Sequence, residues 1–319
     1  MHRPLRALRL SRLLMAAGLL AAASGVRADA VMITDAGGRA VAVTDTSRIV
    51  SIGGAVTEIL YALGLEQRVV AVDTTSLYPP RALAEKPNVG YMRQISAEGV
   101  LGLAPSLILA TEGAGPKETV AVLERASVPF VSVPDKFDGD GVLAKIRLVA
   151  AATGADARGD CIADQVKADL AALAALRGRV AKPLRVLFAM SMVEGRPMVG
   201  GRTTAADALI RLAGAVNAMD GHDGYKSVSE EAIIAAKPDA VLVMQRSQHM
   251  VTPEQIFAHP AFVHSPAAEH KRYIAMDGLY LLGFGPRTAR AARDLAATLY
   301  PELAAGALPS ERGGDLCPL

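Results

Sequence analysis

The chain has 319 residues, of which 51% are hydrophobic and 21% are charged, so it can bury one large or two modest cores and does not have the composition of a disordered protein. Its formal net charge is only +2, and the Lys and Arg residues are scattered rather than gathered in a stripe. The charge pattern therefore gives no reason to expect a nucleic-acid partner.

Residues 1–30 have the pattern of a secretory signal peptide. Several arginines precede the apolar run "LLMAAGLLAAA", and small residues at Ala28 and Ala30 suit a signal peptidase. The run is shorter than the ~20 residues that span a bilayer, and no later segment is long and apolar enough to do so. No cysteine ends the signal, so nothing suggests a lipid anchor, and we expect a soluble mature protein in a Gram-negative periplasm.

Short buried strands alternate with helical segments in residues 31–138. The β-branched "RIVSI" is followed by Gly53-Gly54 and then by "AVTEILYALG", which has helical spacing and ends at Gly64. Further strands are expected at "RVVAVD", "SLILA" and "PFVSVP". This alternation predicts an α/β lobe with a parallel sheet.

The same order of elements restarts at "LRVLFAM", so residues 158–305 are predicted to form a second, similar lobe. The segment "ISAEGVLGLAPSLILA" (95–110) aligns without a gap with "VSEEAIIAAKPDAVLV" (228–243). Each combines an acidic helix start, a helix, a proline and a buried strand. Shared βα patterning could account for this similarity as well as duplication could.

Between the two lobes, residues 139–157 have a continuous helical pattern with no strand partner, and a second helical stretch continues to about Val180. A single connecting helix would form a semi-rigid hinge between two Rossmann-like lobes, unlike a Gly/Ser linker. Residues 306–319 are expected to be a flexible tail.

Motifs of common enzymes are absent from the sequence. There is no GxxxxGK[ST], GxSxG or HExxH pattern, and we expect no catalysis. The segment "GFGPRT" (283–288) begins like a dinucleotide loop but lacks the third glycine, so a tight turn is expected.

Two further features favour no definite site. Four histidines cluster at positions that do not share one helix face, and surface histidines explain them at least as well as a zinc site: His249, His259, His264 and His270. Cys161 and Cys317 could pair in an oxidising compartment, but the sequence does not place them near each other, so their pairing stays open.

Several segments, in this order, resemble the periplasmic haem-binding proteins of bacterial ABC importers: "GGAVTEILYALG", "VDTTSLYPP", "VGYMRQISAEGVLGLAPSLILATEGAGP", "YKSVSEEAIIAAKPDAV" and "LLGFGPR". The resemblance covers nearly the whole mature chain. It implies two α/β lobes bridged by one long helix, with the ligand between them, an architecture shared with cobalamin- and siderophore-binding proteins.

The resemblance implies that Tyr91 is the axial ligand of haem iron and that Arg93 hydrogen-bonds its phenolate. Ferric iron is a hard cation that favours an anionic oxygen donor. A tyrosine keeps its proton at neutral pH, so the iron and a nearby cation must favour the phenolate. On residue types alone, a half-buried turn residue is the more common role for such a tyrosine, and it is the full motif that favours Tyr91 as a ligand. Tyr78 in "SLYPP" is the second candidate ligand.

Other roles follow from the same resemblance. Met92 would supply an apolar wall for haem, and Arg246 would bind a propionate, with Arg202 as a less certain partner. Glu98 and Glu231 match the paired acids that dock onto the transporter, although acids at helix N-termini also stabilise the helices. The strand "VLFAMSM" has no histidine for a second haem, so one haem per chain is expected.

The sequence thus predicts a monomeric periplasmic protein that takes ferric haem, supplied indirectly by an outer-membrane receptor, to an inner-membrane ABC permease and its ATPase. One alternative is a cobalamin or ferric-siderophore carrier of the same class, which needs no axial tyrosine. Another is a metal-binding periplasmic protein that uses the histidine-rich region.

Overall fold

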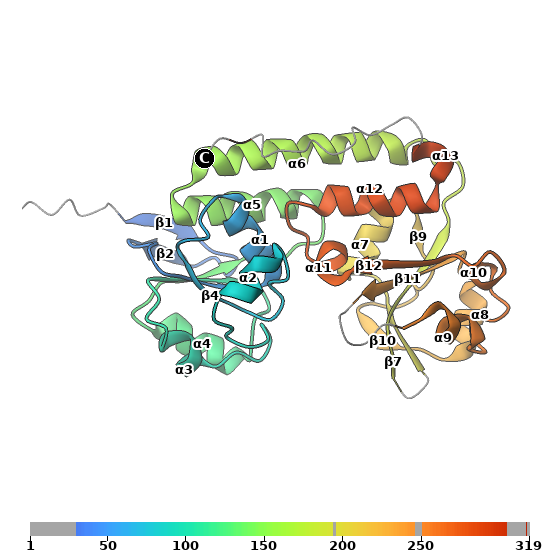
Figure 1. The fold of residues 1–319 in the computed structure, drawn as a ribbon, viewed down its shortest axis with the longest axis horizontal. Helices are drawn as coiled ribbons and strands as arrows, with labels where there is room; N and C mark the ends of the chain where they lie inside the picture. Colours follow the sequence, from blue (N-terminus) through green and yellow to red (C-terminus); the bar gives the residue numbers. More distant parts are fainter. Residues whose placement is uncertain (1–29, 194–195, 246–250, 305–316, 318–319) are drawn as a thin grey trace, which may run out of the picture.

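The computed structural model describes residues 30–193, 196–245, 251–304 and Cys317. Two α/β lobes lie side by side, and one long helix runs across both of them (Figure 1). The predicted signal peptide therefore lies outside the described residues, apart from Ala30, as do Arg246 and His249. No helix in the described ranges is long and apolar enough to cross a membrane.

The N-terminal lobe is built on a four-stranded parallel sheet, as predicted. Its strand order is β4 (Val69–Val72), β3 (Ile49–Ile52), β5 (Leu107–Thr111) and β6 (Phe130–Val133). A hairpin of β1 (Val31–Thr34) and β2 (Ala40–Val43) precedes the sheet. The helices between the strands are α1 (Gly54–Ala62), α2 (Pro80–Glu85), α3 (Ala97–Leu101) and α4 (Lys117–Arg125).

The C-terminal lobe has a mixed sheet. Its parallel part is β7 (Arg185–Val193), β11 (Ala240–Gln245) and β12 (Tyr273–Asp277), and the two-residue β9 (Val216–Asn217) also pairs with β7. The strands β8 (Arg196–Gly200) and β10 (Tyr225–Ser227) add antiparallel pairs at one edge. Part of the glycine-rich stretch after β7 is thus a strand, which the sequence pattern did not predict.

Seven helices complete the described part of this lobe: α7 (Ala205–Leu212), α8 (Glu230–Ala236), α9 (Pro253–Ala258), α10 (Pro266–Glu269), α11 (Gly278–Leu282), α12 (Thr288–Leu299) and α13 (Pro301–Ala304). The turn expected at residues 283–288 is present, between α11 and α12.

The two aligned segments of the sequence adopt the same local structure in both lobes. Ser96 caps α3 and Ser229 caps α8, each through its side-chain oxygen. A residue with positive φ precedes each proline, Ala104 at 47° and Lys237 at 44°. The following strands, β5 and β11, each pair with a strand on both sides.

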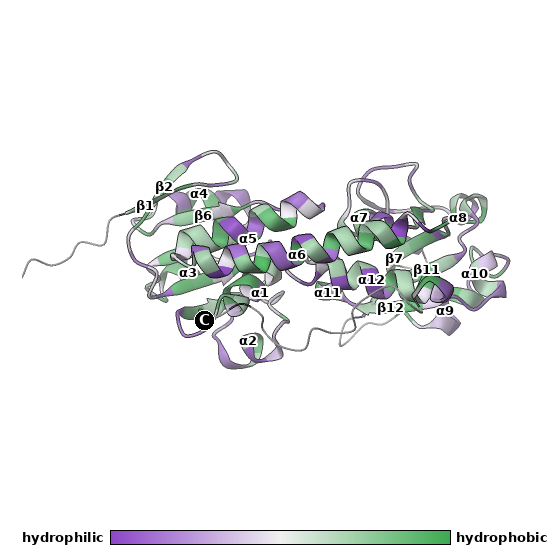
Figure 2. Cartoon of the chain, turned by 90° about the horizontal axis from the view of Figure 1, so that it is seen from above, coloured by the Kyte–Doolittle hydropathy of each residue, from purple (hydrophilic) through white to green (hydrophobic). Residues whose placement is uncertain are grey.

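The connection between the lobes differs from the predicted single helix over 139–157. The helix α5 (Gly139–Thr153) ends because Gly154 is left-handed, with φ 69°. A second helix, α6 (Asp156–Arg177), then packs against α5 on one lobe and α12 on the other. In Figure 2 this helix runs across the whole molecule with mixed hydrophilic and hydrophobic colouring, in keeping with its one-sided burial at Ile162, Ala163 and Val166.

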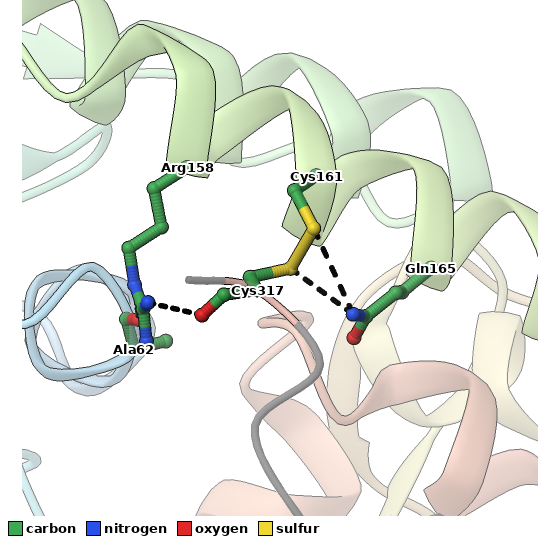
Figure 3. The surroundings of a disulfide bond; sticks show 5 residues. All are labelled: Ala62, Arg158, Cys161, Gln165 and Cys317. Atoms are coloured by element: carbon green, nitrogen blue, oxygen red, sulfur yellow. Dashed lines mark hydrogen bonds between the residues drawn. A yellow bond between two sulfur atoms is a disulfide. The ribbon is translucent and has the colours of Figure 1, made fainter. Parts of the chain in front are cut away.

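The structure answers the question, left open by the sequence, of whether the two cysteines pair. Cys161 on α6 and Cys317 form a disulfide bond with a Cα–Cα distance of 5.8 Å, which is an ordinary spacing. Figure 3 shows Arg158 beside the bond, donating hydrogen bonds to the carbonyl oxygens of Ala62 and Cys317. Cys317 is buried, so the tail predicted to be flexible over 306–319 is anchored at this residue, while its other residues lie outside the described ranges.

Candidate functional site

The loop that leads to Tyr91 is fixed at the carboxyl ends of the N-terminal strands. The buried carboxylate of Asp73, just after β4, accepts hydrogen bonds from the backbone N–H of Gly53 and from the hydroxyls of Thr75 and Ser76. Thr74 N–H donates to the carbonyl oxygen of Gly90 at 2.9 Å. These contacts hold three loops at the sheet edge where α/β proteins usually bind ligands.

Residues 91–94 form a tight turn that is tied to the loop after β5. Gln94 N–H donates to the Tyr91 carbonyl oxygen at 2.7 Å, and Gly115 N–H donates to the Met92 carbonyl oxygen at 3.0 Å. Gly90 enters the turn with φ 93°, which favours glycine. The backbone is therefore anchored on both sides, while the Tyr91 side chain is 43% exposed.

Arg93 is exposed on the same turn, and its positive charge acts on the pKa of Tyr225, which lies in β10 of the other lobe. Burial raises the pKa of the Tyr225 phenol. The backbone N–H of Ala206, the Thr204 hydroxyl and the charge of Arg93 all act in the opposite direction. The turn with Tyr91 and Arg93 therefore lies within electrostatic range of the C-terminal lobe, and the space between this turn and Tyr225 is the candidate site.

Sequence reasoning missed Tyr225. A usable signal was present, because Tyr225 follows Gly224 with φ 76° just as Tyr91 follows Gly90. Both tyrosines also precede a serine-capped helix of the aligned segments. The pattern alone did not show that the two tyrosines lie on facing lobes.

Two other predicted haem contacts, Met92 and Arg202, lie within the described residues and belong to different lobes. Met92 is partly buried and packs against the core of the N-terminal lobe. Arg202 is exposed and pairs with Asp223 at 3.1 Å, also in the C-terminal lobe.

Tyr78, the second candidate ligand, lies beneath the guanidinium of Arg287, 3.5 Å from its ring centroid. Its ring lines a cavity between the lobes and α6, and Tyr91 is not among the residues that line this cavity.

Glu98 and Glu231 occupy equivalent, exposed places in the first turns of α3 and α8. The pKa of Glu231 is lowered because its carboxylate accepts hydrogen bonds from its own backbone N–H and from the Ser229 hydroxyl. Both carboxylates are exposed to solvent, one on each lobe.

The histidine region has no metal-binding geometry within the described residues. His259 lies 3.9 Å from Glu230, and its ring contacts Phe262. In the described ranges, no three His, Cys, Asp or Glu side chains converge on a point where they could hold a metal ion.

Comparison with known proteins places these features in a family. The family model of periplasmic binding proteins matches residues 49–279. The structure resembles the periplasmic heme-binding protein RhuT from Roseiflexus sp. RS-1, with 41% identity, a TM-score of 0.77 and coverage of 81% of this chain and all of that one.

Two more relatives show the range of the similarity. The periplasmic heme-binding protein BhuT, solved in complex with two hemes, is 40% identical over 81% of this chain and 99% of that chain, with a TM-score of 0.76. The Vitamin B12-binding protein of Pectobacterium carotovorum is 27% identical over 61% of this chain and 70% of its own length. With the family model covering both lobes, the chain belongs to the periplasmic binding protein family.

Proposed function

We propose that this protein binds ferric haem between its lobes, with Tyr91 as the axial ligand to iron, and delivers it to an inner-membrane ABC importer. The observation that carries this proposal is the exposed Tyr91 on an anchored turn that also carries the exposed Arg93. The similarity to periplasmic heme-binding proteins at about 40% identity supports the choice of haem as cargo.

The chemistry of the site suits this cargo. A phenolate oxygen is a good donor for the hard ferric ion, and a nearby guanidinium favours the charged form of the phenol. We propose further that Arg246 and Arg202 interact with the propionates.

The remaining parts of the proposal concern transport. The chain is exported by its signal peptide, catalyses no reaction and acts as a monomer. Glu98 and Glu231 dock onto basic residues of the permease, one acid per lobe, and the ATPase then drives release. An outer-membrane receptor supplies the haem indirectly.

A cobalamin carrier is the second candidate, because a Vitamin B12-binding protein is among the relatives. This ligand brings its own metal coordination and does not need an axial tyrosine. The two candidates therefore differ in what replacement of Tyr91 does to binding.

The test is a visible-absorption titration of the mature protein with ferric haem, beside Tyr91→Phe and the matched variant Tyr78→Phe. We expect saturation with a high-spin tyrosinate charge-transfer band, lost in Tyr91→Phe and retained in Tyr78→Phe. The equivalence point decides between one haem and two, the number in the BhuT complex. Absence of saturable haem binding, with binding of cyanocobalamin, would replace haem by cobalamin as the cargo.

A further inference from the structure

The loop 283–287, with the sequence "GFGPR", belongs to the C-terminal lobe but makes its contacts with the N-terminal lobe. It joins α11 to α12, and both helices pack against α7 of the C-terminal lobe. The sequence pattern indicated only a tight turn at these residues. Its contacts with the N-terminal lobe involve the side chains of Arg287 and Phe284 and two backbone carbonyl oxygens that accept from Lys145.

The first contact is an ion pair between Arg287 and Glu58 of α1. The guanidinium Nε and Nη2 donate to the two carboxylate oxygens at 3.0 and 2.9 Å. The Glu58 side chain is only 6% exposed and that of Arg287 is 22% exposed. The guanidinium also stacks on Tyr78 of the N-terminal lobe and lies 5.0 Å from the ring centroid of Tyr280 in α11.

The second contact is made by Lys145 of α5, whose side chain is fully buried. Its Nζ donates to Asp135 Oδ1 at 2.7 Å within the N-terminal lobe. The same atom donates to the carbonyl oxygen of Phe284 at 3.2 Å and to that of Gly283 at 3.5 Å, both in the other lobe. A buried ammonium is thus shared between the two lobes.

Packing around the loop is close. Phe284 is buried against Phe137, with 5.3 Å between the ring centroids. At the start of α1, a Cβ atom on Gly54 would lie 2.6 Å from Leu279 Cδ1 of α11. The Leu279 side chain of the C-terminal lobe therefore packs directly against the backbone of α1, with no room for a side chain at Gly54.

Part of the space between the long helix α6 and loop 283–287 is not filled by side chains. A cavity of about 380 Å³ lies beside the loop, lined by Glu58, Tyr78 and Arg287 together with Gln165 and Val166 of α6. Beside the cavity, loop 283–287 therefore links the two lobes in addition to α6, whose Asp169 lies 4.0 Å from Arg290 of α12.

We propose that loop 283–287 is an inter-lobe latch, in which Glu58, Lys145 and Arg287 are positioning residues that hold the cleft at one width in the ligand-free protein. Separation of the lobes would leave Glu58 without its cation and Lys145 without two of its acceptors. Buried charges that lose their partners are strongly disfavoured, so the loop adds a second connection to the one made by α6, which packs on both lobes. The latch therefore fixes the N-terminal lobe, and with it the turn that carries Tyr91, relative to the C-terminal lobe.

The test measures the distance between the lobes without any ligand, so it does not depend on the identity of the cargo. Spin labels are placed at Val122→Cys on α4 and Ile234→Cys on α8, two exposed positions in different lobes, with the native disulfide intact. Double electron–electron resonance then gives the distance distribution. We expect one narrow distribution in the parent and a broader or longer one in Glu58→Gln/Lys145→Met.

The control variant is Asp35→Asn, which breaks the ion pair between the buried Asp35 and the partly exposed Arg39 within the N-terminal lobe. It should lower stability without a change in the inter-lobe distribution. If Glu58→Gln/Lys145→Met does not fold by circular dichroism, Arg287→Lys decides, because it keeps the charge but loses the two-pronged pairing. An unchanged distribution in the folded latch variants, or equal broadening in Asp35→Asn, would overturn the latch.

Discussion

Arg93 lies two residues after Tyr91 on the same turn, and its positive charge acts to lower the pKa of Tyr225 in the other lobe. We predict that Arg93→Ala weakens ferric haem binding by about tenfold, which corresponds to about 1.4 kcal/mol, because the phenolate loses a neighbouring cation. Arg93→Lys should retain part of the affinity. Titration of each variant, followed at the tyrosinate band, measures the effect, and equal affinities for Arg93→Ala and the parent would contradict it.

Asp35 illustrates how one buried carboxylate makes stability depend on pH. Burial raises its pKa, but hydrogen bonds from Arg39 and from Ser132 N–H outweigh this, so the pKa lies below its ordinary value of 3.8. The group therefore contributes stability above pH 3.8, and this contribution is lost as the pH falls through the lowered pKa. Urea unfolding of the parent and Asp35→Asn should differ most near pH ~6 and converge toward pH ~3; a constant difference would argue against this origin.

At the scale of elements, the disulfide bond ties α6 to a residue 156 positions later in the chain. Closing a long loop restricts the unfolded chain, so Cys317→Ser should lower the free energy of unfolding by about 2–4 kcal/mol. Urea unfolding measures the loss. The double variant Cys161→Ser/Cys317→Ser serves as the control, since it should not respond to dithiothreitol while the parent should.

The helices α3 and α8 show why some elements could be predicted well. Each has a serine cap, an acid in the first turn and a following proline, and these local signals are sufficient to begin and end a short helix. The helix expected over 139–157 ends at Thr153 in the structure, because Gly154 after it is left-handed. The strand β8 was missed, since its pairing with β7 and β10 is a contact between strands that no local pattern specifies.

At the scale of the whole molecule, Glu98 and Glu231 present one exposed carboxylate from each lobe. We predict that Glu98→Lys/Glu231→Lys binds ferric haem as the parent does but abolishes haem uptake through the cognate importer in proteoliposomes. Glu118→Lys, an acid in the first turn of α4, is a matched control that should transport normally. Normal uptake by the double variant would exclude these two acids from docking.

The sequence by itself determined the α/β class, the two similar lobes and the turn that carries Tyr91 and Arg93, because strand pattern, helix caps and glycine positions act over a few residues. Only the tertiary structure decided that Tyr225 comes within electrostatic range of Arg93, that Cys161 meets Cys317 and that loop 283–287 binds the opposite lobe. Each of these three contacts joins residues more than 100 positions apart. Such contacts depend on how whole elements pack, and no local pattern in the chain encodes them.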